Sequence, residues 1–179
     1  MAAPNQAFVA IERHLGFPET RSRTTARSLQ EGDLWPLGGP GAAPELDIDD
    51  VVSLIIALAV DGPLHRAAGA VRAWRDMTPG GADLTGAPDR IDTAGRALDI
   101  FADAAVHGEH PDLLRRDLIE VVSSWPEIVI ANGLTGAAAR FVPAGADAGH
   151  WQAAGHRKST TLNGAALVDC LRELFGDSE

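Results

Sequence analysis

Residues 47–60 read DIDDVVSLIIALAV and predict a helix that is apolar on every side. Asp47 is the kind of residue that caps a helix N-terminus, and the acids that follow it suit the first turn, where they complement the helix dipole. From Val51 to Val60 only Ser53 is polar, so this helix must be buried all round. In a chain this small, such burial predicts cover from a second copy as well as from the chain itself, and we expect a homo-oligomer that forms through Val51–Val60.

Two shorter helices are expected upstream of this segment. Apolar residues recur at helical spacing from about residue 5 to residue 15, and Gly16 suits the left-handed position that ends a helix. The second helix begins near Pro18, which a first turn tolerates, and ends around Gly32. Residues 34–44, LWPLGGPGAAP, then predict a loop or a very tight hairpin.

The second helix has a surface of the kind that contacts DNA. Between Thr20 and Gln30 it contains three arginines and no acid. Arg, Ser, Thr and Gln side chains donate hydrogen bonds to phosphates and base edges. Arg23 and Arg27 are four residues apart and therefore share a helix face. The alternative is a solvated face whose arginines pair with nearby glutamates, namely Glu12, Glu19 or Glu31.

A spaced set of residues runs through this region: Leu15-Gly16-Phe17, Arg23, Ala26-Arg27, Leu29, Glu31, Leu34, Pro36, Gly38-Gly39, Asp50, Leu54 and Leu58. Over about 50 of the 179 residues it resembles the N-terminal winged helix-turn-helix of MerR-type regulators and related phage excisionase-like proteins. The resemblance implies that the second helix enters the major groove and that residues 35–44 are the wing. The candidate DNA contacts are Arg21, Arg23, Thr24, Arg27, Ser28, Gln30, Gly38 and Gly39.

The rest of the chain changes its apolar period. Segments rich in Val and Ile, with a hairpin-type turn at Asn132-Gly133, predict a small antiparallel sheet. The expected elements are helices at residues 63–77, 91–108 and 164–175, a helical turn at 111–116, and strands at 118–123, 127–131, 138–142 and 155–162.

The predicted fold is therefore α+β, a winged helix-turn-helix followed by helices and a small C-terminal antiparallel sheet with a terminal helix. Residues 78–88, TPGGADLTGAP, are the expected linker between residues 1–77 and a small α+β domain at residues 89–179. A second surface is predicted to bind a protein partner or nucleic acid, and its residues are Arg140, Trp151, Arg157 and Lys158. The alternative for that surface is a solvated edge strand guarded by charge.

Composition limits the classes of function. With 25 acidic and 15 basic residues the formal charge is −10, which excludes a protein that coats nucleic acid through bulk positive charge. A local basic face remains compatible with DNA recognition. The single cysteine, Cys170, excludes an intramolecular disulfide and a multi-thiolate metal site. No signal peptide or long apolar run is present, so we expect a soluble cytoplasmic protein with no membrane contact.

No motif points to catalysis, and we expect a protein that is neither an enzyme nor dependent on a cofactor or metal. The segment at residues 155–159 lacks the Gly-Lys adjacency of a phosphate loop, and His107 and His110 straddle a glycine at a helix end. The expected function is sequence-specific DNA binding as an oligomeric regulator of a phage or mobile element. Two alternatives stay open: a small terminase subunit, and an acidic inhibitor or adaptor of a nucleic-acid-processing partner.

Overall fold

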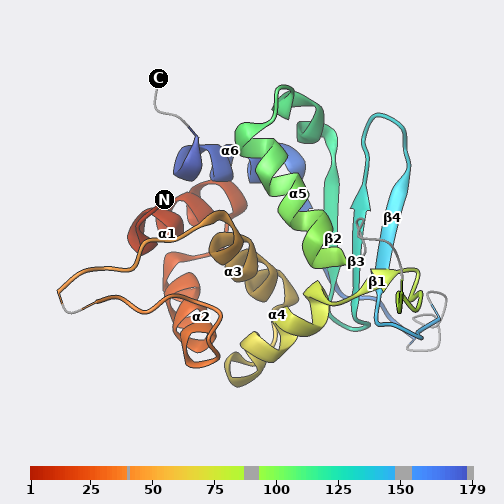
Figure 1. Cartoon of the computed structure of the whole chain (residues 1–179), viewed down its shortest axis with the longest axis horizontal. Coiled ribbons are helices and arrows are strands. Elements are labelled where there is room, and N and C mark those ends of the chain that lie inside the picture. The colour runs from red at the N-terminus through yellow and green to blue at the C-terminus, as the bar shows by residue number, and fades with distance from the viewer. Residues whose placement is uncertain (40, 87–92, 148–154, 177–179) are drawn as a thin grey trace.

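The described chain has helices on one face of a five-stranded antiparallel sheet (Figure 1). The structure is a computed structural model that describes residues 1–39, 41–86, 93–147 and 155–176. It confirms the expected α+β class. The elements are α1 (Pro4–Leu15), α2 (Glu19–Glu31), α3 (Ile48–Val60), the 3-10 helix η1 (Leu64–Arg66), α4 (Ala67–Arg75), β1 (Thr78–Pro79), α5 (Ala94–His107), the 3-10 helix η2 (Pro111–Arg116), β2 (Leu118–Val122), β3 (Glu127–Ala131), β4 (Ala138–Val142), β5 (Ser159–Asn163) and α6 (Gly164–Phe175).

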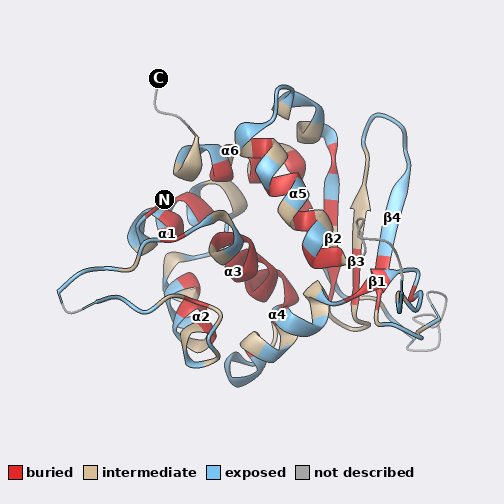
Figure 2. Ribbon diagram, in the orientation of Figure 1, coloured by how far each residue is buried: buried red, intermediate tan, exposed pale blue. Residues whose placement is uncertain are grey.

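Helix α3 lies at the centre of the molecule, and every residue from Val51 to Val60 is buried (Figure 2). Its start is fixed by a reciprocal cap: the Asp47 carboxylate accepts from the Asp50 N–H at 2.9 Å, and the Asp50 carboxylate accepts from the Asp47 N–H at 3.0 Å. The expected role of Asp47 as a cap is therefore confirmed.

The cover over α3 comes from the same chain. Helices α2, α4 and α5 and strands β2 and β5 all contact it. The expectation that a second copy buries Val51–Val60 is corrected, because no apolar face of α3 is left for a partner. The spacing within one segment shows that a helix must be covered, but it does not show which elements of the chain provide the cover.

The sheet has the strand order β1-β4-β3-β2-β5, and each neighbouring pair is antiparallel. Val121, Ile128 and Phe141 occupy paired positions on adjacent strands and are buried in the core beneath the helices. Because side chains alternate along a strand, Glu120 and Arg140 lie on the opposite face. The strands expected near residues 118–123, 127–131 and 138–142 are confirmed as β2, β3 and β4.

Two C-terminal boundaries differ in detail from expectation. The strand expected at residues 155–162 is shorter and later, because β5 begins at Ser159 and ends at Asn163. Asn163 then caps α6 by accepting from the Ala165 N–H at 2.8 Å. The single helix expected at residues 63–77 is divided into η1 and α4.

Part of the predicted linker belongs to the sheet. Thr78 pairs with Val142, and the Gly80 N–H donates to the Arg140 carbonyl at 2.8 Å. The expectation of an irregular linker is thus corrected for residues 78 and 79, which pair with Val142 and Phe141 of β4. Residues 87–92, which include the last two residues of that segment and the expected start of the next helix, lie outside the described residues. The division into residues 1–77 and 89–179 stays a prediction.

A three-residue turn joins α1 to α2. Gly16 has a φ of +75°, a left-handed conformation that ends α1, and Pro18 stands directly before α2. The described residues between 34 and 44 form no paired strand, so this segment is a loop rather than a tight hairpin. The loop extends away from the helices (Figure 1). An isolated β-bridge between Ala2 and Leu46 fixes the chain where the loop returns to the start of α3. The winged helix-turn-helix stays a prediction.

Candidate functional site

Helix α2 has one buried face and one outward face. Ser22, Thr25, Ala26 and Leu29 are its buried residues. At 3.6 residues per turn, Arg23, Thr24 and Arg27 lie on the opposite side. The side chain of Arg27 is 81% exposed. These three of the eight predicted DNA contacts therefore share a face that is open to solvent, and we call Arg23, Thr24 and Arg27 the α2 outward face.

Arg23 is held in a fixed orientation against α1. Its guanidinium donates to Asn5 Oδ1 at 2.8 Å and to Glu19 Oε2 at 3.1 Å. It also lies 5.0 Å from the ring centroid of Phe8, a cation–π contact worth about 0.5–1 kcal/mol at an exposed site. Phe8 in turn stacks on Trp35, with ring centroids 6.0 Å apart. The same aromatic pair thus orients Arg23 and anchors the start of the loop.

Arg27 is much less constrained than Arg23. Its Nε lies 3.8 Å from Glu31 Oε1, and both side chains are exposed. An exposed pair at this separation contributes well under about 1 kcal/mol. Arg27 can therefore reorient towards another anion at little cost.

The other polar side chains predicted on α2 are engaged within the chain. Arg21 forms an ion pair with Asp61 at 2.5 Å, the Ser28 hydroxyl donates to the Leu64 carbonyl, and Gln30 donates to the Pro36 carbonyl at 3.0 Å. The structure therefore does not bring Arg21, Ser28 and Gln30 onto the α2 outward face. Glu19 and Glu31 lie within 4 Å of Arg23 and Arg27, as the solvated-face alternative anticipates. The partner of Arg21 is Asp61, which that alternative does not name.

The loop beside α2 has a fixed base and an exposed tip. Trp35 is buried at the base, whereas Leu37 is 76% exposed. A Cβ on Gly38 would lie 2.5 Å from the Ala42 carbonyl oxygen, so the turn requires glycine there. A Cβ on Gly39 would meet nothing within 4 Å. Of the two glycines predicted to contact DNA, Gly38 is required by the shape of the turn, whereas nothing in the packing requires glycine at position 39.

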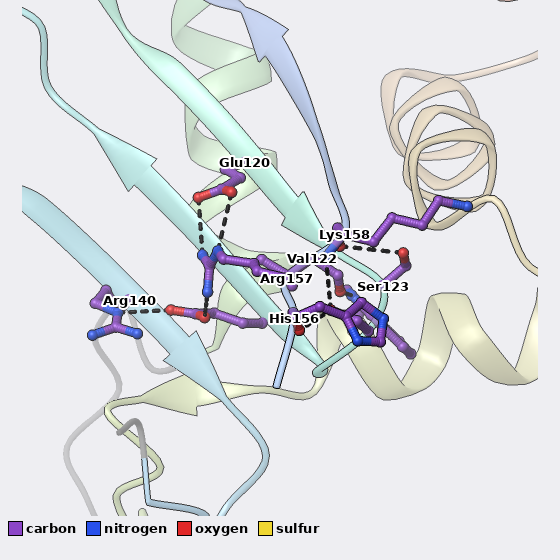
Figure 3. Close-up of polar contacts among 10 residues, drawn as sticks. Glu120, Val122, Ser123, Arg140, His156, Arg157 and Lys158 are labelled. Carbon is purple, nitrogen blue, oxygen red and sulfur yellow. Dashed lines mark hydrogen bonds and ion pairs between the residues drawn. The ribbon is translucent and has the colours of Figure 1, made fainter. Parts of the chain in front are cut away.

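In the C-terminal half, a buried carboxylate organises the predicted arginines. Glu127 is 0% exposed and accepts from Arg140 Nε and from Arg157 Nη1, both at 2.6 Å. Arg157 also makes two hydrogen bonds to Glu120, at 2.9 and 3.2 Å. Figure 3 shows Glu120, Arg157 and Arg140 in one cluster on the sheet. The two arginines are therefore held by ion pairs that tie neighbouring strands together.

These ion pairs shift the titration of their members. The hydrogen bonds from Arg157 lower the pKa of Glu120, and the same bonds raise the pKa of Arg157. Both groups therefore stay charged over the whole physiological range.

The remaining predicted partner residues separate from this cluster. Lys158 extends away from it (Figure 3), and its amine lies 3.1 Å from Asp61 Oδ2. Asp61 therefore joins Arg21 of α2 to Lys158, which precedes β5. Trp151 lies outside the described residues.

Sequence reasoning missed the acids that hold these cations. Glu120 and Glu127 are the only charged residues between Leu118 and Ala131. A carboxylate in an otherwise apolar strand needs a partner, because an unpaired buried charge is strongly disfavoured. A lone carboxylate in an apolar strand therefore predicts an ion pair, but it does not identify which arginine is the partner.

A further ion pair lies between α4 and α5. Arg75 donates to both carboxylate oxygens of Asp99 at 2.7 Å, and Asp49 lies beside them at the start of α3. Burial raises the pKa of Asp49, and the nearby Asp99 carboxylate raises it further. Burial also raises the pKa of the Cys170 thiol, to about 12, which keeps it protonated and unreactive.

Other features of the described chain are negative. No group of three or more His, Cys, Asp or Glu side chains within the described ranges has the geometry of a metal site. None of the helices in that part of the chain combines the length and the apolar character needed to cross a membrane.

No family model matches the chain, and comparison with curated proteins and with solved structures found no match.

Proposed function

We propose that this protein is a sequence-specific DNA-binding regulator that reads double-stranded DNA with the α2 outward face. The observation that carries the proposal is a helix-turn-helix-like pair, α1 and α2, joined by a three-residue turn with a left-handed Gly16. The outward face presents two arginines and a threonine, which are side chains that bind phosphates and base edges. The loop at residues 34–44 is a second contact, because it extends beyond the helices close to α2 (Figure 1).

The local charge predicts how such binding depends on salt. Arg23 and Arg27 are opposed by Glu19 and Glu31 on the same helix, and the whole chain carries −10. Even if both arginines neutralised phosphates, the slope in a plot of log K against log salt would be only about −2. Binding without a sequence match is therefore weak, and base contacts contribute most of the affinity.

Selection of bound fragments from a genomic DNA library tests the proposal, followed by measurement of affinity for the selected duplex. We expect the double variant Arg23→Ala/Arg27→Ala to lose at least about tenfold in affinity, since each good base contact is worth about 1–3 kcal/mol. The matched control is Arg96→Ala/Arg116→Ala, which removes two exposed arginines elsewhere in the chain. Equal affinities of the two double variants would overturn the assignment of α2.

A second candidate is an acidic inhibitor or adaptor that binds a nucleic-acid-processing protein. One observation favours it: Arg21, Arg23 and Arg27 each have a carboxylate within 4 Å in the free chain. In that case no duplex is selected above the background, and the acidic surface is the one that binds.

A small terminase subunit is distinguished from a regulator by its mass in solution, because a ring of eight or more copies indicates DNA packaging.

A further inference from the structure

A cleft of about 720 Å³ lies between α2, the end of α3 and α4. This volume is in the range of small-molecule sites in proteins, roughly 300–1,000 Å³. The hollow exists because α4 turns small residues towards it. Gly69, Ala70 and Ala73 line it from α4, and Ala57 lines it from α3. A Cβ at Gly69 would meet no atom within 4 Å, so the space is open at that point.

One wall of the cleft is an oriented aromatic ring. Trp74 lines the cleft, and its indole N–H donates to the Val122 carbonyl at 3.2 Å. That hydrogen bond satisfies the polar atom of the indole and fixes the plane of the ring. The face of the ring and the nearby Val60 side chain offer an apolar surface that suits a flat ring.

The rim of the cleft is positively charged in a chain whose net charge is −10. Arg21 and Arg66 line it, and Asp61 is the only acid among its described lining residues. Both oxygens of Asp61 are already used, Oδ1 by Arg21 at 2.5 Å and Oδ2 by Lys158 at 3.1 Å. The cleft therefore has more cations than Asp61 can neutralise.

Arg66 is the arginine of this rim that Asp61 does not pair with. Its guanidinium has no hydrogen bond or ion pair to another side chain in the described part of the chain. The planar fork of an arginine matches the two oxygens of a carboxylate. Arg21 already pairs with a carboxylate on this rim, through a single contact to Asp61 Oδ1.

We propose that this cleft binds a small molecule that joins a flat aromatic ring to a carboxylate. The ring lies against Trp74 and the small residues of α4, and the carboxylate pairs with Arg66 beside Arg21. The inference does not depend on DNA binding. It does place the ligand next to Arg21 on α2, so a bound carboxylate competes with Asp61 for that side chain.

Titration of the isotopically labelled full chain with indole-3-acetate tests the proposal, with the neutral indole-3-acetamide as the matched probe. The readout is the indole N–H resonance of Trp74, assigned by its loss in Trp74→Phe. We expect a saturable shift with a Kd near about 1 mM, the affinity that ordinary ligand efficiency allows for a probe of this size. The acetamide should bind at least about tenfold more weakly, because it lacks the charge that Arg66 recognises.

Two pairs of variants complete the experiment. Arg66→Gln should weaken indole-3-acetate at least about tenfold, whereas Arg96→Gln, on α5, should leave its affinity unchanged. Gly69→Leu should abolish binding by filling the cleft, whereas Gly69→Ala should retain it, since a methyl group there meets no neighbour. The proposal is overturned if the acetate and the acetamide bind equally, if neither shifts Trp74, or if only a peptide segment binds the cleft.

Discussion

Glu127 is a fully buried carboxylate that accepts hydrogen bonds from arginines on both sides. Removing one partner of a buried ion pair costs about 3–5 kcal/mol, because the remaining charge is left uncompensated. Arg140 and Arg157 are partly exposed and can be rehydrated, so we expect Glu127→Ala to cost about 3 kcal/mol, at the lower end of that range. Urea unfolding of the variant and the wild type measures the difference.

Glu120→Ala is the control for that prediction. The Glu120 side chain is 28% exposed, and its removal leaves Glu127 in place to hold Arg157. We expect it to cost no more than about 1 kcal/mol, because Arg157 stays paired with Glu127 and solvent still reaches the site. Equal losses for the two variants would show that burial of Glu127 does not set the strength of this cluster.

At the scale of single residues, the sequence predicts local roles and misses distant partners. Asp47 acts as a helix cap as expected, and Asn163 does the same for α6, because a cap bonds only to backbone a few residues away. Arg21 and Arg157 have partners 40 and 37 residues away in the chain, so their environment depends on the fold. For that reason the sequence places Arg23 and Arg27 on one helix face, but it does not show that Asp61 holds Arg21.

At the scale of elements, one carboxylate links the polar edges of α1 and α6, beside their buried apolar contact. Glu173 accepts from His14 and Arg13, both at 2.7 Å, and these hydrogen bonds lower its pKa. A carboxylate with a lowered pKa in the folded state stabilises the protein above its unfolded-state pKa, and that contribution is lost as pH falls through the folded-state value. We therefore expect stability to fall as pH drops below about 4.5, the ordinary value.

Glu173→Gln isolates this contribution. The variant should be less stable than the wild type at pH 7, by about 1 kcal/mol at most for so exposed a pair, and the difference should vanish near pH 3. Thermal unfolding at both pH values measures it. A difference that is the same at pH 7 and pH 3 would contradict the role of the charge.

Asp49 gives the opposite dependence on pH at the start of α3. Its pKa is raised by burial and by Asp99, while Arg75 opposes the shift and Asp47 adds to it. A raised pKa means that the ionised form is disfavoured on folding, so the favourable contribution is present below pH 3.8 and is lost as pH rises through the folded-state value. We expect Asp49→Asn to raise stability at pH 7 by up to about 1 kcal/mol, with the gain absent at pH 3.

Asp103→Asn serves as the matched control for Asp49→Asn. Asp103 is an exposed acid on α5 that lines the same small cleft as Asp49. Its substitution should change stability by less than about 0.5 kcal/mol at either pH. A gain equal to that of Asp49→Asn would show that general surface charge, rather than the local environment of Asp49, is responsible.

The elements themselves were largely predictable, because their signals are local. The apolar spacing of α1, the Val and Ile content of β2 and β3, and the Asn-Gly turn before β4 each occur within a few residues of the element. Strand β1 could not be found in this way. It has only two residues, and its strand conformation depends on pairing of Thr78 with Val142, 64 positions later.

At the scale of the whole molecule, one buried cluster extends from Phe8 on α1 to Leu171 on α6. It includes Met77 and Ala94, which lie on either side of the segment expected to be a linker, and the Ala94 N–H donates to the Met77 carbonyl at 2.8 Å. A chain with a continuous core unfolds as one cooperative unit, whereas two domains joined by a linker unfold separately.

We therefore expect a single unfolding transition for the whole chain. Two variants, one that retains only Trp35 and one that retains only Trp125, report on the two halves, because Trp35 stacks on Phe8 and Trp125 lies between β2 and β3. Within each variant, unfolding followed by tryptophan fluorescence should give the same urea midpoint and slope as unfolding followed by circular dichroism. Midpoints that differ between fluorescence and circular dichroism within one variant would instead support separate domains at residues 1–77 and 89–179. The coupling has a functional consequence, because a ligand or substitution in one half then changes the stability of the α2 outward face as well.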